Sequence, residues 1–237
     1  MFHKLKFLLA VPVFSLLAAC VGPMPKIDSS PGKLASIRTI AVIRAPEPKT
    51  YTVMFFGHPG MAFGLIGGLV AAGDQNDKQE RLSKAYREQG TAVAANLASQ
   101  ISAELVRIGY DARVEDADWE EVDGKYKLPY EKIKSDADAV LVISSSTTGF
   151  VSTGITSDYM PTIWVGVNLL GKDRKEPLYR GFHATGWQPK SDGWKFTPPT
   201  KGFANFDALM TDTRASAKAL EDATAGIAAT VAADLKR

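Results

Sequence analysis

Hydroxyl side chains form one run that could support nucleophilic catalysis. Ser144, Ser145 and Ser146 end an apolar stretch, and His183 lies in a later segment of alternating pattern. A serine hydroxyl becomes a nucleophile when a base within hydrogen-bonding reach accepts its proton. Neither a Gly-x-Ser-x-Gly nor a Ser-x-x-Lys pattern surrounds these serines. The sequence therefore favours a polar strand end, keeps a serine-type hydrolase as an unfavoured alternative, and predicts no catalytic residue.

Carboxylates form a second candidate site. Six of them fall within nine residues, namely Glu115, Asp116, Asp118, Glu120, Glu121 and Asp123. Oxygen ligands at this density could bind Ca²⁺, but an EF-hand loop requires glycine where Glu121 stands and a bidentate glutamate where Lys127 stands. We therefore expect a solvated acidic loop, with no metal site and no cofactor.

The single cysteine stands at the end of the first apolar segment. Lys4 and Lys6 precede the stretch Phe7–Leu17, and two alanines separate that stretch from Cys20. The stretch is too short to cross a bilayer as a helix and has the length of the apolar region of a signal peptide. The pattern predicts that residues 1–19 are a signal peptide.

The motif Leu17-Ala-Ala-Cys20 resembles the lipobox of bacterial lipoproteins. The resemblance implies cleavage after Ala19, a diacylglyceryl thioether on the sulfur of Cys20, and acylation of its new amino group. Val21 occupies the position where enteric-type bacteria carry an inner-membrane retention aspartate, so the same analogy implies the periplasmic face of the outer membrane. A lipidated sulfur can be neither a nucleophile nor a metal ligand.

Charge argues against a nucleic-acid partner. The chain has 28 basic and 26 acidic residues, and removing Lys4 and Lys6 with the signal peptide leaves 26 of each. A neutral domain has no excess of cations to neutralise a row of phosphates. Its length suits one domain. We expect a lipidated tether at 20–35 and a single domain at 36–237 with a glycine-rich apolar insertion at 57–73.

Hydrophobic periodicity predicts the elements that position these residues. Apolar side chains recur every four positions from Arg81 to Ile108, which predicts one helix, and an alanine-rich helix is predicted at Phe206–Leu235. A helical turn or two is expected at 129–135, and a Pro- and Gly-rich loop at 191–201. Alternating or continuous apolar runs predict strands, at 37–43, 51–56, 110–115, 137–146, 162–170 and 178–187.

Together these elements predict an α+β fold. The sheet is expected to be mixed or antiparallel, with about five strands and with helices packed on it, in the order β-α-β-α-β-β-β-α.

The predicted domain resembles a group of envelope lipoprotein domains. The segments Thr39–Ile43, Ile101–Gly109, Ser135–Ile143 and Leu178–Gly181 carry the resemblance over residues 36–235. The group includes the periplasmic domain of the curli secretion channel, the lipoprotein activator of penicillin-binding proteins, and the amino-terminal domain of the Tol translocation protein. The resemblance implies the fold only, because the shared pattern contains no catalytic residue.

The insertion places small residues four positions apart, at Gly60, Gly64, Gly68 and Ala72. On a helix this spacing gives one bare face that another backbone can approach closely. Five glycines between 60 and 73 disfavour that helix in water by roughly 1 kcal/mol each. Three interpretations remain open. The segment packs on its own domain, it forms a self-association face or a shallow membrane contact, or it is a glycine loop that cradles a ligand.

Aromatic residues flank the Pro-rich loop near the end of the chain. Trp187, Trp194 and Phe196 could contact a partner or a glycan, because flat rings give a large contact area for little conformational entropy. Packing of these rings under the loop is the alternative interpretation.

These observations predict a non-enzymatic lipoprotein of the cell envelope. It would be attached to the membrane through Cys20 and would act as a docking, assembly or regulatory factor for a protein partner, with homo-oligomers possible in principle. The second hypothesis is a subunit of an oligomeric secretion or pore-forming complex in which 51–73 enters the membrane.

Overall fold

The structure, a computed structural model, describes residues 25–59, 64–188, 192–199 and 201–237. Nine strands lie within these ranges, namely β1 (Thr39–Ile43), β2 (Thr52–Phe55), β3 (Asp111–Glu115), β4 (Glu120–Val122), β5 (Lys125–Lys127), β6 (Ala139–Ser152), β7 (Met160–Leu170), β8 (Pro177–Thr185) and β9 (Trp194–Thr197). The helices are α1 (Pro31–Leu34), α2 (Gly64–Glu88), α3 (Val93–Arg107), the short 3₁₀ turn η2 (Tyr130–Lys132), α4 (Phe206–Thr211) and α5 (Thr213–Asp234).

The α+β class with a mixed sheet is confirmed, but the sheet is larger than predicted. Seven strands rather than five form it, in the order β3-β1-β6-β7-β8-β9, with β2 also paired to β6. The remaining strands, β4 and β5, form a separate hairpin. The strand predicted at 51–56 is confirmed by β2, so two strands precede the first long helix, whereas the predicted order β-α-β-α-β-β-β-α has one there.

Strand β6 organises the sheet because it is long enough to serve two partners along one edge. Its first half pairs in parallel with β1, where Val42 lies opposite Leu141. Its last residues pair in parallel with β2, where Thr52 lies opposite Gly149. Its other edge pairs with antiparallel β7, and a bulge interrupts that register between Ser145 and Thr147.

The helix predicted from Arg81 to Ile108 is wrong in its extent. The structure contains two helices there, α2 and α3, separated at Gly90, whose φ of +70° is a left-handed conformation that glycine adopts readily. The helix predicted at Phe206–Leu235 is likewise divided, because Asp212 caps α5 by accepting a hydrogen bond from the backbone of Ala215. Neither break between helices was predicted from the periodicity of the apolar residues.

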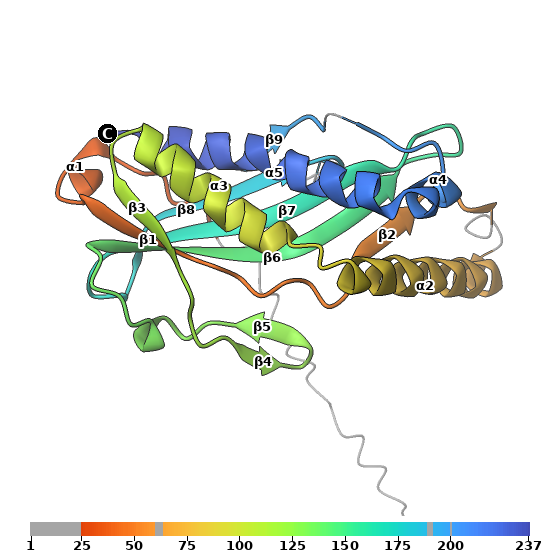
Figure 1. Ribbon diagram of the computed structural model, residues 1–237, viewed down its shortest axis with the longest axis horizontal. Helices are drawn as coiled ribbons and strands as arrows, with labels where there is room; N and C mark the ends of the chain where they lie inside the picture. Colours follow the sequence, from red (N-terminus) through yellow and green to blue (C-terminus); the bar gives the residue numbers. More distant parts are fainter. Residues whose placement is uncertain (1–24, 60–63, 189–191, 200) are drawn as a thin grey trace, which may run out of the picture.

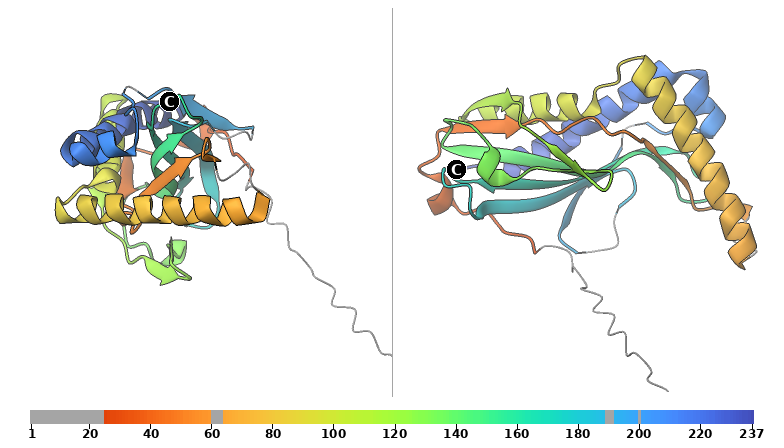
Figure 2. Two further views of the ribbon diagram at one scale, coloured as in Figure 1. Left: turned by 90° about the vertical axis from the view of Figure 1, so that its right-hand side faces the viewer. Right: turned by 90° about the horizontal axis from the view of Figure 1, so that it is seen from below.

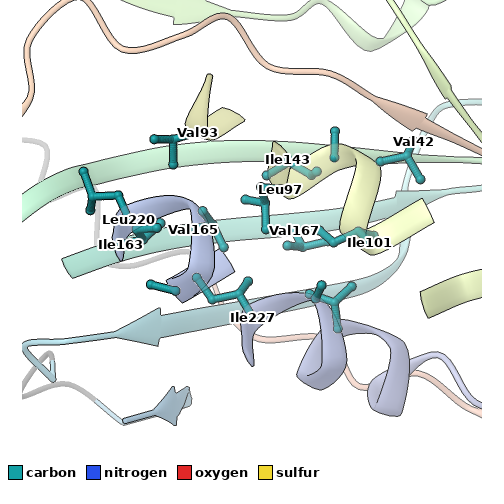
Figure 3. Close-up of a cluster of buried hydrophobic side chains, with 14 of the residues drawn as sticks. Val42, Val93, Leu97, Ile101, Ile143, Ile163, Val165, Val167, Leu220 and Ile227 are labelled. Atoms are coloured by element: carbon teal, nitrogen blue, oxygen red, sulfur yellow. The ribbon is translucent and has the colours of Figure 1, made fainter. Parts of the chain in front are cut away.

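The main core lies between the sheet and helices α3 and α5, which cover the same face of the sheet (Figure 1). Leu97 and Ile101 from α3 and Ile227 from α5 point at strand residues such as Val165 (Figure 3). All four side chains are buried. Since burial of such side chains is the main favourable term in folding, this layer holds the sheet in one conformation.

A smaller apolar cluster lies on the opposite face of the sheet, beneath the β4–β5 hairpin and η2. Val140 and Val142 of β6 contact it, and Ile133 and Trp119 close it from outside. The helical turn predicted within 129–135 is confirmed by η2.

The predicted loop at 191–201 contains a strand. Residues Trp194–Thr197 form β9, which pairs in parallel with the last part of β8. This short strand sits between glycine- and proline-rich flanks, so its pattern was too brief to stand out.

The first described residues attach to the part of the β8 edge that β9 does not cover. The backbones of Ile27 and Arg180 exchange two hydrogen bonds, of 3.0 and 2.9 Å. Ser29 donates a hydrogen bond to the carbonyl of Asp234 at the end of α5. The described part of the predicted tether therefore lies against the domain. The signal peptide and Cys20 lie outside the described residues.

Helix α2 crosses one end of the molecule, and its first turns project beyond the other elements (Figure 2). Its later turns are anchored by the buried side chains of Leu82 and Tyr86. In the described ranges, no helix combines the length and apolar character needed to cross a bilayer.

Candidate interaction surface

The face of the sheet opposite α3 and α5 carries a cluster of aromatic side chains. Alternation along strands sends successive side chains to opposite faces. Val165 and His183 point to the helices, so their neighbours Trp164 and Phe182 point away from them. Trp194 lies opposite Phe182 in the register of β8 and β9 and shares that outward direction.

The rings on this face contact one another. The ring centroids of Trp164 and Trp194 are 5.7 Å apart, and those of Phe182 and Trp194 are 5.5 Å apart. Trp187 follows β8 and folds back on Trp164 at 5.1 Å, where the indole N–H of Trp164 donates a 2.7 Å hydrogen bond to the carbonyl of Trp187. Phe56, just after β2, reaches Trp187 at 4.8 Å.

We call this set of residues the aromatic face. Its members are Phe56, Trp164, Phe182, Trp187, Trp194 and Phe196, the last placed there by its pairing with Ala184. Phe56 is 42% exposed, and the other five are half-buried. Mutual packing therefore leaves part of each ring at the surface, where a contacting molecule can reach it.

Polar groups border the aromatic face at the start of β8. The guanidinium of Arg180 donates to the side-chain oxygen of Asn168 at 2.9 Å and to the carbonyl of Pro25 at 3.3 Å. The side chains that alternation places on this face of β7, β8 and β9 include no carboxylate. Within these three strands, the aromatic face thus combines apolar rings with the guanidinium of Arg180, which its hydrogen bonds hold in place.

The small-residue positions of α2 are open. Gly60 lies outside the described residues, and Gly64 is the first residue of α2. No heavy atom lies within 4 Å of a side-chain carbon built on Gly68, and Ala72 is exposed. Leu69 beside them is 68% exposed. The described part of this face therefore does not pack on its own domain.

A cavity of about 500 Å³ opens between the start of α3, the β1–β2 connection and the bulge of β6. The serine run lines it: Ser144 donates to the carbonyl of Gly166 at 3.2 Å, and Ser145 bonds to Thr148 at 2.8 Å. Lys49, Trp119 and Tyr126 form its outer wall. Its size falls in the range of small-molecule pockets, and its hydroxyls could orient a polar ligand.

The structure does not bring His183 to the serines. Ser145 lies opposite Val165, which lies opposite His183, so two strand spacings of about 5 Å separate the serine from the histidine. His183 is fully buried, with its Nε2 2.8 Å from the hydroxyl of Tyr179 and its Nδ1 2.9 Å from that of Thr230. Burial lowers the pKa of His183 to about 4.

The acidic run is divided among several cations. Asp116 pairs with Arg44, Glu120 with Lys132, and Glu121 with Lys49, whose pKa that carboxylate raises. The part of the chain that the structure describes contains no group of three or more histidine, cysteine or acidic side chains placed to hold a metal ion.

Half of the aromatic face was predictable from the sequence. The aromatic residues around the Pro-rich loop indicated Trp187, Trp194 and Phe196 but not Trp164, Phe182 or Phe56. Alternation within each predicted strand shows which residues share a face with Trp164 or with Phe182. Whether these two faces are the same face of the sheet depends on the pairing register, which is not visible in a single sequence. The cavity was also missed, because a β-bulge leaves no clear mark in the sequence.

No protein-family model matches the chain, and no curated protein matches it. The solved structures that match it include two dodecamers of PelC from Paraburkholderia phytofirmans, the second carrying a single substitution. The first has a TM-score of 0.35 at 12% identity and covers 84% of this chain and 89% of the PelC chain. The second has a TM-score of 0.37 at 12% identity and covers 90% of this chain and 96% of the PelC chain. Similarity at this level does not establish a common function.

Proposed function

We propose that the protein is a bacterial lipoprotein, attached through Cys20 to the periplasmic face of the outer membrane, and that it acts there as a non-enzymatic docking or assembly factor. The observation that carries the proposal is the position of Cys20, directly after Leu17, Ala18 and Ala19 at the end of a short apolar segment. Attachment to a surface raises the effective concentration of a domain for partners on that surface.

Two features of the domain support a docking role. Serines and a histidine that could have formed a hydrolytic pair lie on separate strands, and the histidine is buried with both ring nitrogens bonded. The first turns of α2 present exposed Leu69 and Val70 beside Gly68, which is a combination suited to close contact with a protein partner or a second copy.

Expression of the full chain in a bacterium tests the anchor. We expect mature protein that begins at Cys20, carries the added mass of acyl chains and sediments with membranes. The variant Cys20→Ser should lose both the added mass and the processing, whereas Ser30→Ala, ten residues further on, should retain them. Protein that remains in the soluble fraction, without acyl chains and with a free thiol on Cys20, contradicts the proposal.

Photo-crosslinking in intact envelopes tests the docking role. A photoreactive residue at Leu69 on α2 should give a discrete protein adduct, and one at Val106, which is also apolar and exposed but lies on α3, should not. An adduct of twice the chain's mass identifies a homo-oligomer. Identical adduct patterns from both positions contradict docking through α2.

A further inference from the structure

The described chain begins close to the predicted lipid anchor. Four residues lie between Cys20 and Pro25, and the five Cα–Cα steps from one to the other span at most about 18 Å in a fully extended chain. The backbone of Ile27 is bonded to β8, so this short segment starts from a fixed point. Wherever the acyl chains enter the membrane, that point lies near the bilayer surface.

The fixed point borders the aromatic face. Arg180 holds the carbonyl of Pro25 with its guanidinium and points to the same side of β8 as Phe182. Two residues along a strand span about 7 Å. An anchor leaving from Pro25 therefore brings the membrane beside the aromatic face, while α3 and α5 lie on the other side of the sheet (Figure 1).

The chemistry of the aromatic face suits the bilayer interface. Tryptophan is enriched at that depth because its ring is apolar and its N–H is polar. Trp164, Trp187 and Trp194 supply three such rings. Their strands place no carboxylate there to repel anionic headgroups, and Arg180 adds a cation.

The helical side differs in the character of its surface. It carries exposed ion pairs on its helices, such as Lys218 with Asp222 on α5 and Arg107 with Glu104 on α3, whereas on the sheet side such pairs lie at the β4–β5 hairpin and η2, as Lys132 with Glu120 does, and not among the rings of the aromatic face. Such a surface is stable in water and gains nothing from contact with lipid.

We propose that the aromatic face rests on the lipid surface to which Cys20 is attached, so that the domain lies on the membrane in one orientation with α3 and α5 turned away from it. This inference rests on the proposed anchor. It adds that the sheet itself contacts the lipid and that the tether does not simply suspend the domain in the periplasm.

Environment-sensitive fluorophores test the orientation. The acylated protein is labelled at Gln188→Cys, next to Trp187, or at Val106→Cys on α3, and is reconstituted in vesicles of phosphatidylethanolamine and phosphatidylglycerol. Both positions are exposed. We expect a blue-shifted label at 188 that is quenched by lipids carrying nitroxides near the headgroup, and an unshifted, unquenched label at 106.

A second substitution tests the energetics of the contact. Phe56→Ser removes the most exposed ring of the aromatic face, and we expect it to lower the ratio of membrane-contacting to free domain about fivefold, read from quenching of the label at 188. Val106→Ser removes an exposed apolar side chain from the helical side and should leave the ratio unchanged. Equal effects of the two substitutions overturn the proposal.

The outcomes distinguish failure of the proposed anchor from failure of the proposed orientation. Absence of acyl mass on Cys20 overturns the anchor itself. Acylated protein whose labels at 188 and 106 report the same aqueous environment retains the anchor and overturns the orientation. A blue shift at 188 that persists in detergent without vesicles and rises with protein concentration also overturns it, because a second copy then covers the aromatic face.

Discussion

The hydroxyl of Tyr179 donates a 2.7 Å hydrogen bond to the carboxylate of Asp234. Tyr179 belongs to β8, and Asp234 is the last residue of α5. The same carboxylate pairs with Lys195 of β9. The end of the chain is therefore attached to two strands at once, beneath the helix layer.

Removing the hydroxyl of Tyr179 should weaken this attachment. We expect Tyr179→Phe to reduce the free energy of unfolding by about 2 kcal/mol, since the bond is buried and its acceptor is charged. Urea unfolding measures the change. The control Tyr126→Phe, at an exposed ring, should have little effect, and a loss of equal size in both variants would show that the Asp234 contact is not responsible.

His183 should make stability depend on pH. Burial lowers its pKa from 6.5 to about 4, against the opposing charge of Asp234, and Lys195 and Lys26 add to the lowering. Between these values the unfolded chain binds a proton that the folded chain does not. Stability is therefore complete above about pH 6.5 and falls by up to about 3 kcal/mol as the pH drops toward 4.

Comparison of two pH profiles isolates this contribution. The free energy of unfolding of the wild type should fall more steeply across the window from 6.5 to 4 than that of His183→Gln, which has no proton to gain there. Parallel profiles would mean that His183 is not neutral in the folded protein.

Gly149 should tolerate no side chain. Its φ is +155°, and a Cβ placed on it would approach the backbone nitrogen of Thr52 to 2.6 Å, where β2 pairs with β6. We expect Gly149→Ala to cost about 2–3 kcal/mol of stability because β2 must move. Gly73→Ala, in open space on α2, should instead stabilise the protein by up to about 1 kcal/mol in the same thermal unfolding measurement.

Two substitutions at Gly68 should distinguish the stability of α2 from its role in association. With no heavy atom within 4 Å of its added carbon, Gly68→Ala should stabilise α2 by up to about 1 kcal/mol. If the bare face of α2 is a contact, Gly64→Val combined with Gly68→Val should abolish self-association in sedimentation experiments. Association that survives both valines would remove this face from the proposal.

Glu47 caps a helix from another part of the chain. Its carboxylate accepts 2.9 Å hydrogen bonds from the backbone N–H groups of Ala94 and Ala95. The N-cap residue of α3, Ala92, has only a methyl group and cannot accept them. We expect Glu47→Ala to lose about 1 kcal/mol in chemical unfolding. Glu80→Ala, at an exposed position on α2, provides the comparison; a smaller loss at 47 than at 80 would contradict the capping role.

Local patterns predicted the elements of the fold better than their ends. The run from Val140 to Ile143 is apolar on both sides, and it was placed correctly as a central strand. The polar serines after it suggested that the strand ended there, yet β6 continues to Ser152 because β2 and β7 supply partners for its backbone. Tertiary pairing, which no local pattern encodes, overrode the polar signal.

The aromatic face likewise depends on both local sequence and tertiary pairing. Each ring is visible in the sequence, and Trp194 was selected as a contact residue. Its neighbours Phe182 and Trp164 join it only through the register of three strands. Which side of a strand is covered depends on where the helices pack, and that is a property of the whole chain.

The bonding of Ile27 to β8 has a mechanical consequence. Because the chain after Cys20 is hydrogen-bonded to the sheet at Ile27, the domain cannot rotate freely about that residue. A pulling force on an acylated Cys20 would therefore act on the two hydrogen bonds with Arg180. With the aromatic face on the lipid as proposed, neighbouring molecules would all turn the side of α3 and α5 toward the periplasm.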